Sequence, residues 1–243
     1  KRQGLRSPMG YEISGATKNK VMSCLNQVME EAVRCGVLVS NPMVSLESFK
    51  EGNKERGVFT NQEMGELFPG DRTRLLEIWG SLMWACYFMV LRDTGHRMGE
   101  QAVLTWEDLF EENDRYGFTI TKSMDWYTKE TKPGTKTGYS RATLIEPETY
   151  TLLQEHKAQH PWPLIFTLDG ERGIIAETAR KHLRLAAKNA QVDLQGRTPY
   201  CFRHTANTRL LLHTAPHHVR FLMGHRSDCL LYTSPSPRDS TSS

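Results

Sequence analysis

The sequence predicts a mainly α-helical protein that carries one small antiparallel sheet, an α+β fold class. Two observations indicate the helices: residues 17–34 place apolar side chains on one helical face, and residues 82–91 form an unbroken apolar run. The sheet is indicated by residues 116–120, where apolar and small residues alternate, and by the β-prone residues 141–145.

Residues 1–56 are predicted to form part of a small helical domain with a linker after it. Residues 17–34 would form its main helix, and Gly36 then offers a stop, because glycine readily adopts the left-handed conformation that ends many helices. The apolar positions of this helical face are Val21, Cys24, Leu25, Val28, Met29, Ala32 and Val33.

The domain boundary is expected near Arg56. The Asn41–Pro42 pair and the polar residues 50–56 are typical of a domain exit and a linker. The chain begins with Lys1 rather than Met, so we expect it to be a piece of a longer protein with an N-terminal part upstream. A second, mixed domain is expected over residues 57–228.

The second domain is predicted to open with helices. Thr60 and Glu63 fit a capping box, which marks a helix start. The run at residues 82–91 is interpreted as a buried helix, because its ten residues are half of the roughly 20 that a bilayer crossing needs, and we expect no membrane partner. Proline loses no needed hydrogen bond at the first helical position. Three prolines stand where later helices are expected to begin: Pro147, Pro199 and Pro216.

The cysteines and the charge of the chain limit the classes of protein to which it can belong. The five cysteines are scattered without a Cys-x-x-Cys pair, which indicates neither a disulfide framework nor a zinc site and fits a reducing cytosol. The net charge is only +3, but residues 172–226 contain ten Lys or Arg against two acids. This region can therefore neutralise phosphates, although a solvated helix face explains the same pattern equally well.

Histidine and glycine patterns indicate no metal or nucleotide cofactor. His156 and His160 share a helix face, but the residues between them lack the glutamate of a metalloprotease, so we interpret both as solvated helix histidines. The sequence has no Gly-rich loop that would cradle phosphates. Tryptophans among apolar residues are interpreted as core side chains; these are Trp79, Trp84 and Trp106.

Two arginines in separate motifs are the strongest functional signal. Arg97 lies at a Gly-containing break just after the apolar run, in the segment Asp93–Glu100, and Arg203 lies in the segment Thr198–Thr205. Transesterification of a phosphodiester builds negative charge on the non-bridging oxygens, and paired guanidiniums meet that charge with permanently protonated donors. A single arginine is far more often a surface or salt-bridging residue, so the ordered set of motifs carries the interpretation.

Four basic motifs follow one another along the chain. They are Arg97, Lys136 in the segment Thr135–Arg141, Arg203, and the pair Gly224–His225. In this order they resemble the tyrosine recombinase family, also called phage-type integrases, and the resemblance extends to about Asp228. It implies a tyrosine-recombinase catalytic fold over residues 57–228, preceded by part of a helical core-binding domain that helps to clamp DNA.

The resemblance also implies a role for each motif in site-specific DNA recombination. Arg97, Arg203 and His225 would bind the scissile phosphate. Lys136 would protonate the leaving 5′ oxygen, although Lys129 and Lys132 lie in the same expected loop. A tyrosine would attack the phosphorus and form a 3′-phosphotyrosine.

Supporting residues and partners follow from the same resemblance. Glu100 and His204 would support the site rather than react. Neither a metal, a cofactor nor a small-molecule substrate is implied. The implied partners are double-stranded DNA and further copies of the chain, assembled on DNA in the cytoplasm of a bacterial or phage-infected cell.

Two positions depart from the family pattern. Tyr200 stands where the family usually has histidine, and a phenol is a poor general base at neutral pH because its reference pKa is about 10. The family nucleophile lies about nine residues after the histidine, where this chain has Ser234. Tyr232 is the only tyrosine beyond His225, which makes it the one candidate nucleophile in this region.

The tail from Cys229 onward resembles the translation of a transposon-based sequencing adapter. We therefore interpret residues 229–243 as an artefact of sequence assembly and expect the genuine sequence to end near Asp228. On this interpretation Tyr232 is a coincidence, and the native nucleophile has been cut off.

Other classes of protein remain open. A catalytically inactive DNA-binding protein of the same fold fits the displaced tyrosine, whereas the retained Arg97, Arg203 and His225 oppose it. A helical interaction module, in which these residues form ordinary ion pairs, predicts no salt-dependent binding to duplex DNA. A tyrosine-linked topoisomerase is chemically close, but the motifs match integrases better.

Overall fold

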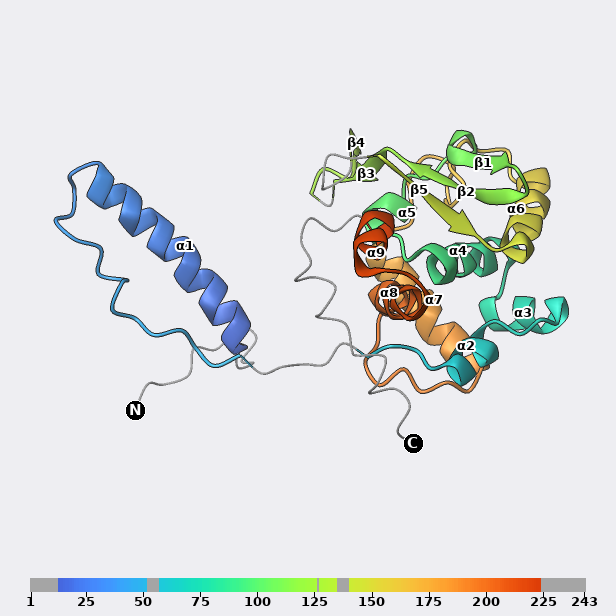
Figure 1. Cartoon of the computed structure of the whole chain (residues 1–243), viewed down its shortest axis with the longest axis horizontal. Coiled ribbons are helices and arrows are strands. Elements are labelled where there is room, and N and C mark those ends of the chain that lie inside the picture. The colour runs from blue at the N-terminus through green and yellow to red at the C-terminus, as the bar shows by residue number, and fades with distance from the viewer. Residues whose placement is uncertain (1–12, 52–56, 126, 135–139, 224–243) are drawn as a thin grey trace. The chain divides into compact units, whose positions relative to one another are not determined.

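The computed structural model describes residues 13–51, 57–125, 127–134 and 140–223 of the 243-residue chain (Figure 1). The chain divides into two compact units, Lys1–Glu55 and Arg56–Ser243. Helices make up most of the regular structure, and the strands form two small antiparallel sheets. The predicted fold class, mainly α with a small antiparallel sheet, is confirmed.

The first unit contains one long helix, α1 (Gly15–Arg34), at the place where the apolar face predicted it. Ser14 caps its start, because the Ser14 side chain accepts a hydrogen bond from the Thr17 N–H at 3.2 Å. Asn19 holds the later segment against the helix: its Oδ1 accepts from the Phe49 N–H at 2.7 Å, and its Nδ2 donates to the Phe49 carbonyl at 2.9 Å. Among the described residues, no side chain of α1 is buried.

The second unit combines helices with two small sheets. Its helices are α2 (Asn61–Leu67), α3 (Arg72–Trp79), α4 (Leu82–Thr94), α5 (Met98–Gln101), the short 3-10 helix η1 (Trp106–Asp108), α6 (Pro147–Gln159), α7 (Ala176–Asn189), α8 (Tyr200–His213) and α9 (Pro216–Met223). Its strands are β1 (Leu109–Glu112), β2 (Arg115–Ile120), β3 (Lys122–Met124), β4 (Thr131–Pro133) and β5 (Arg141–Ile145). The larger sheet has the order β1-β2-β5, with Phe118 opposite Thr143, and β3 pairs with β4 in a separate hairpin.

Local sequence signals set several of these boundaries. The Thr60 side chain accepts from the Glu63 N–H at 3.1 Å, and the Glu63 carboxylate accepts from the Thr60 N–H at 2.8 Å, so the predicted capping box is confirmed. Pro147 and Pro216 are the first residues of α6 and α9, and Pro199 directly precedes α8.

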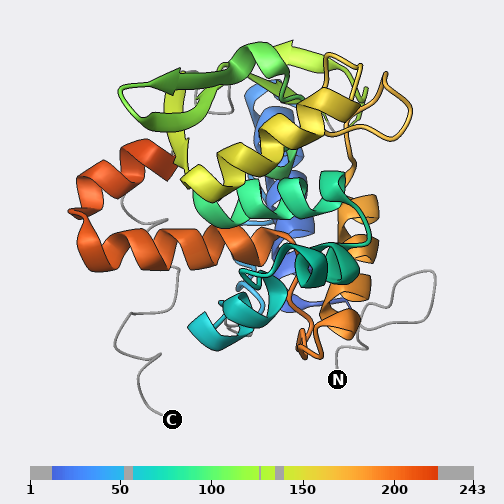
Figure 2. The ribbon, with the colours of Figure 1, turned by 90° about the vertical axis from the view of Figure 1, so that its right-hand side faces the viewer.

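Helix α4 forms the centre of the second unit and lies between α6 and α8 (Figure 2). Every residue from Trp84 to Leu91 is buried, and the Phe88 ring stacks on Trp79 with 4.3 Å between the ring centroids. Among the described residues, no single helix is long and apolar enough to cross a membrane; α3 and α4 pass that test only together, and they are bent by 96°. The apolar run is thus a buried core helix, as predicted.

The end of α4 packs closely against α8 at a glycine. Gly95 has a φ of 59°, the left-handed conformation that glycine adopts most readily, and its N–H donates to the Leu91 carbonyl. A Cβ atom at this position would lie 3.0 Å from the Ala206 side chain and 3.3 Å from the Arg203 Cα. The close approach therefore places the residues after α4 directly against α8.

Candidate active site

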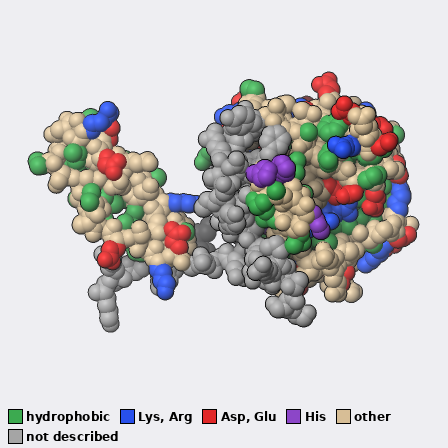
Figure 3. Space-filling model, in the orientation of Figure 1, with side chains coloured by type: hydrophobic (Ala, Val, Ile, Leu, Met, Phe, Trp, Pro, Cys, Tyr) green, Lys and Arg blue, Asp and Glu red, His purple; other side chains and the backbone are tan. Residues whose placement is uncertain are grey.

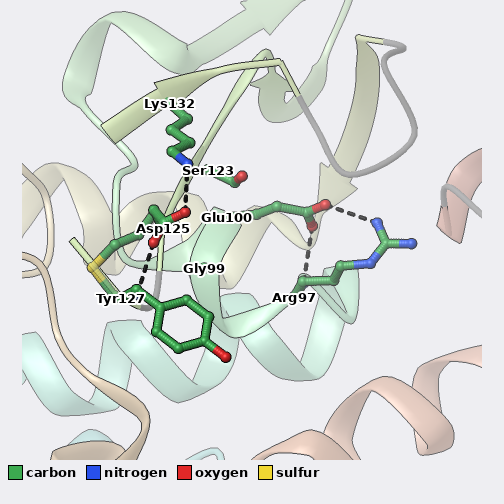
Figure 4. A pocket seen from close by; sticks show the side chains of 8 residues that line it. Arg97, Gly99, Glu100, Ser123, Asp125, Tyr127 and Lys132 are labelled. Atoms are coloured by element: carbon green, nitrogen blue, oxygen red, sulfur yellow. Dashed lines mark hydrogen bonds and ion pairs between the residues drawn. The ribbon is translucent and has the colours of Figure 1, made fainter. Parts of the chain in front are cut away.

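Arg97 directly precedes the short helix α5 as its N-cap, Glu100 lies within that helix, and the two residues hold each other in place. Glu100 Oε2 accepts from the backbone N–H of Arg97 at 2.9 Å, and Glu100 Oε1 accepts from Arg97 Nη1 at 2.9 Å. The two side chains point toward each other in Figure 4. The Arg97 side chain is 22% exposed and that of Glu100 is 1% exposed, so the guanidinium keeps some contact with solvent while its carboxylate partner does not.

Arg141 is a second partner of Glu100, and the sequence analysis had assigned it no role. It starts β5, where residues 141, 143 and 145 point inward and the two between them outward. Its Nη2 lies 2.6 Å from Glu100 Oε2 and its Nη1 lies 3.1 Å from Glu100 Oε1, a bidentate pair. Its Nε donates to the Leu222 carbonyl at 3.0 Å. The sequence did carry a signal for this role. Inward and outward residues alternate along β5, which places Arg141 on the inward face, and an arginine buried there needs a buried anion as its partner.

Glu100 is an ionised carboxylate in this environment. Burial by itself raises its pKa, but the hydrogen bonds and charge of Arg141, followed by the charges of His96 and Arg97, outweigh burial and lower the pKa to about 2. At neutral pH the site therefore contains a buried negative charge shared by two guanidiniums.

Arg203 brings a third guanidinium from α8. It is 3% exposed, its Nη1 donates to the Gly95 carbonyl at 2.8 Å, and its Nη2 donates to the Met223 carbonyl. Burial and then the neighbouring charge of Arg97 lower the pKa of Arg203 to about 10, which leaves the group protonated at neutral pH. We call Arg97, Arg141 and Arg203 with Glu100 the guanidinium cluster.

His96 lies beneath the cluster as a neutral, fully hydrogen-bonded imidazole. The Gln101 Nε2 donates to the Tyr87 carbonyl at 3.0 Å, so the Gln101 Oε1 is the acceptor for His96 Nδ1 at 3.0 Å. His96 Nε2 lies 2.7 Å from Thr143 Oγ1, within hydrogen-bond distance. Burial is the main reason why the pKa of His96 is lowered to about 4. The hydrogen bonds join the residue before Arg97 to strand β5.

A pocket of about 270 Å³ lies beside Arg97 and Glu100 (Figure 4). Its other side is the β3–β4 hairpin. Lys132 Nζ lies 2.6 Å from Asp125 Oδ2 there, and this hydrogen bond, followed by the backbone N–H groups of Thr128 and Tyr127, lowers the pKa of Asp125 to about 2. The residues that line the pocket are Arg97, Gly99, Glu100, Ser123, Met124, Asp125, Tyr127 and Lys132.

The structure places some of the residues that the sequence analysis selected and leaves others undescribed. Arg97, Glu100 and Arg203 come together as described above. Tyr200 is the first residue of α8, is 42% exposed, and stands edge-on to the buried His204 ring with 4.9 Å between the ring centroids. Three residues lie outside the described part of the chain: Lys136, His225 and Tyr232.

The interpretation of His156 as a solvated histidine is wrong. His156 is 5% exposed and its Nε2 lies 2.9 Å from the Ile165 carbonyl, because α6 packs this face against the segment after it. Burial lowers the pKa of His156. His160 is partly buried, and its Nε2 lies 2.7 Å from the Leu164 carbonyl. Within the described residues, no three His, Cys, Asp or Glu side chains are grouped so as to hold a metal ion.

The guanidinium cluster has an excess of positive charge. The cluster holds three guanidiniums and one carboxylate, which pairs with Arg97 and Arg141, and His96 is neutral at pH 7, so the net charge of these groups is +2 (three positive charges less one negative). Holding like charges together in a buried place costs free energy unless an anion joins them. This arrangement is chemically suited to bind a phosphate and to stabilise negative charge that develops on its oxygens.

Charge on the surface of the second unit is mixed. Figure 3 shows acidic and basic side chains interspersed on the face in view, rather than one continuous basic patch.

The family comparison agrees with this geometry. A model of the phage integrase family matches residues 57–232, which is most of the chain and ends at Tyr232. No curated protein sequence matches this chain.

Several solved structures share the fold. The Tn1549 transposon integrase in complex with a circular intermediate DNA superposes with a TM-score of 0.74 at 19% identity, over 92% of this chain and 76% of that chain. A lambda integrase dimer bound to a COC′ core site gives 0.68 at 15% identity, over 92% and 60%. The XerH recombinase bound to a palindromic difH substrate gives 0.63 at 15%, over 91% and 68%. These likenesses show the fold.

Proposed function

Because this chain belongs to the phage integrase family, we propose that it carries out site-specific DNA recombination through a 3′-phosphotyrosine intermediate. The single observation that supports the reaction is the guanidinium cluster, in which Arg97 and Arg203 are held close enough for one charge to lower the pKa of the other. A phosphodiester is an anion that matches this arrangement, because guanidiniums donate paired hydrogen bonds to phosphate oxygens.

In the proposed reaction a tyrosine hydroxyl loses its proton and its oxygen bonds to phosphorus, while the bond from phosphorus to the 5′ oxygen breaks. The leaving oxygen takes a proton from Lys136, and attack by a 5′ hydroxyl later reverses the step. Arg97, Arg203 and His225 would stabilise the charge on the non-bridging oxygens. Two features of the cluster support this role: its guanidiniums remain protonated, and buried hydrogen bonds fix them in place.

We propose that the native nucleophile is absent from this sequence, because Ser234 stands about nine residues after His225, where the family has its tyrosine. Tyr232 is the competing candidate, since the family match ends there. Amplifying and resequencing the source DNA across the codons after Asp228, with primers in native flanking sequence, decides between them. A different tail with a tyrosine about nine residues past His225 supports our proposal, and the same tail makes Tyr232 the candidate.

A multimer on double-stranded DNA is part of the proposal, in the cytoplasm of a bacterial or phage-infected cell. The similar structures include DNA complexes, and those of lambda integrase are described as a dimer and a tetramer. Duplexes selected from a random pool by binding would yield a preferred site, and a denaturing gel of the chain with its native terminus restored would then reveal covalent protein–DNA complexes. Binding without covalent attachment would instead favour the alternative, a catalytically inactive DNA-binding protein.

A further inference from the structure

Arg141 contacts two elements that are far apart in the sequence. From β5 its Nη1 and Nη2 bind Glu100 on α5, and its Nε donates to the Leu222 carbonyl on α9 at 3.0 Å. The Arg141 side chain is 3% exposed, so these contacts are made away from water. One guanidinium thus uses its two edges to join Glu100 to α9.

Arg203 makes the matching contact at the next residue. Its Nη2 donates to the Met223 carbonyl, so two consecutive carbonyls of the last described turn of α9 accept from two different guanidiniums. Hydrogen bonds with a charged donor are stronger than those between neutral groups. Arg141 and Arg203 together therefore hold this turn of α9.

The position of Arg141 is itself fixed. Thr143, two residues further along the same inward face of β5, has its Oγ1 within hydrogen-bond distance of His96 Nε2 at 2.7 Å, and His96 directly precedes Arg97. Thr143 also lies opposite Phe118 in the sheet. Strand β5 is therefore fixed to the segment between α4 and α5, and Arg141 has a defined register relative to Arg97.

We propose that Arg141 is a positioning residue that fixes the end of α9, and so the starting point of the Gly224–His225 segment, relative to Glu100 and Arg97. This inference rests on the proposed function, in which His225 contacts the same phosphate as Arg97 and Arg203. A lysine at this position would keep the charge, but all its donors are on one nitrogen, so it lacks the rigid fork by which the three nitrogens of Arg141 meet both Glu100 oxygens and the Leu222 carbonyl. Arg141→Lys therefore separates the positioning role from the charge.

Hydrogen exchange tests the first half of the proposal on the full chain. In Arg141→Lys we expect backbone amides in the peptide covering residues 216–226 to exchange about tenfold faster, because a charge-assisted hydrogen bond to α9 is lost. Arg92→Lys is the matched control: Arg92 Nε is paired with Asp93 at 2.7 Å, its side chain is 13% exposed, and it contacts neither Glu100 nor α9 in any hydrogen bond of the described residues. Unchanged exchange of this peptide in a folded Arg141→Lys protein would overturn the proposal.

The NMR signal of the His225 imidazole tests the second half of the proposal, that Arg141 positions the segment that carries His225. A general loss of stability would not change the response of this one signal to DNA. The Cε1–H resonance of His225, assigned with His225→Gln, should shift on adding duplex DNA to the parent and to Arg92→Lys. At duplex concentrations that saturate Arg141→Lys, its His225 resonance should not shift, whatever the change in its affinity. A parent-like shift in Arg141→Lys contradicts the proposal.

Failure of the parent to bind DNA and failure of Arg141→Lys to fold can each be told apart from failure of the proposal. If the parent shows no salt-dependent DNA binding, the proposed function fails, while the exchange experiment still decides whether Arg141 fixes α9. If Arg141→Lys does not fold, Glu100→Gln replaces it, since this variant keeps Arg141 but removes its anionic anchor. The same peptide should again exchange faster, and no change there would overturn the proposal.

Discussion

The guanidinium cluster and the β3–β4 hairpin border the same pocket but are held in different ways. The side chains of Glu100 and Arg141 are 1% and 3% exposed and pair with each other, the Leu222 carbonyl accepts from Arg141, and the Gly95 carbonyl accepts from Arg203. In the hairpin, the Lys132 side chain is 58% exposed where it meets Asp125, and Tyr127 is 97% exposed. One side of the pocket is therefore buried and fixed, and the other is open to solvent.

This difference indicates which side of the pocket contributes most to binding an anion. Charges withdrawn from water interact strongly, and removing one partner leaves the other uncompensated. An exposed ion pair is screened by water and salt and contributes little. We therefore expect substitutions in the guanidinium cluster to have large effects and substitutions in the hairpin to be tolerated.

The largest effect is expected from Arg203→Ala, measured in a version of the chain with its native terminus restored. Covalent attachment to DNA should fall by about a thousandfold, because a donor that stabilises the transition state is removed. Binding to DNA should remain measurable, since the Arg97 guanidinium is retained. Arg209→Ala, an exposed position on the same helix, is the control and should attach DNA like the parent. Parent-like attachment by Arg203→Ala on denaturing gels would refute the role of Arg203.

Next in size is Glu100→Gln, which leaves Arg97 and Arg141 without their shared carboxylate. Breaking a buried ion pair costs about 3 kcal/mol or more, and we expect that loss in the free energy of unfolding from urea titrations. Glu77→Gln is the control, because its partner Arg74 and Glu77 itself are 48% and 59% exposed. That variant should change stability by less than about 1 kcal/mol. Equal effects of the two variants would remove the contrast between buried and exposed pairs.

A pH titration of stability should report His96. Its folded pKa of about 4 lies below its ordinary value of 6.5, so between these values the unfolded chain binds a proton that the folded chain does not. Stability is therefore lost as the pH falls from 6.5 toward 4, by about 2 kcal/mol between pH 7 and pH 5. His96→Gln should show a shallower dependence, with a residual slope from His156 and His182, whose pKa values burial also lowers. An unchanged slope would contradict the buried neutral imidazole.

The smallest effect is expected from Lys132→Ala in the hairpin. The Lys132 side chain is 58% exposed in its pair with Asp125, so water screens the pair and the free energy of unfolding should change little. Urea titrations in low and high salt would check this, because screening should reduce even that difference. A loss as large as that of Glu100→Gln would show that the hairpin is as firmly held as the guanidinium cluster.

Much of the fold was predictable because its signals are local. The capping box at Thr60, the helix starts at Pro147 and Pro216, and the buried run at residues 82–91 each depend on a few neighbouring residues. The mainly helical class with a small sheet follows from the same short-range patterns.

The interior of the site was less predictable because it depends on contacts between distant segments. Glu100 and Arg141 are 41 positions apart, and only the register of β5 brings them together. His156 was misjudged for the same reason, since its burial depends on the segment that packs over α6. Lys136, His225 and Tyr232 lie outside the described residues, so their roles stay predictions.

The claim that the guanidinium cluster binds a DNA phosphate is tested most directly by the affinity for duplex DNA across a range of salt concentrations. This affinity should be measured for the full chain and for Arg97→Ala. Arg97 is the partly exposed member of the guanidinium cluster, with a side chain that is 22% exposed. We expect the affinity of the parent to fall steeply with salt. In a plot of the logarithm of the binding constant against the logarithm of the salt concentration, the slope of Arg97→Ala should be shallower by about one, as expected when one phosphate contact is lost. Salt-independent binding, or identical slopes for the two proteins, would contradict the claim.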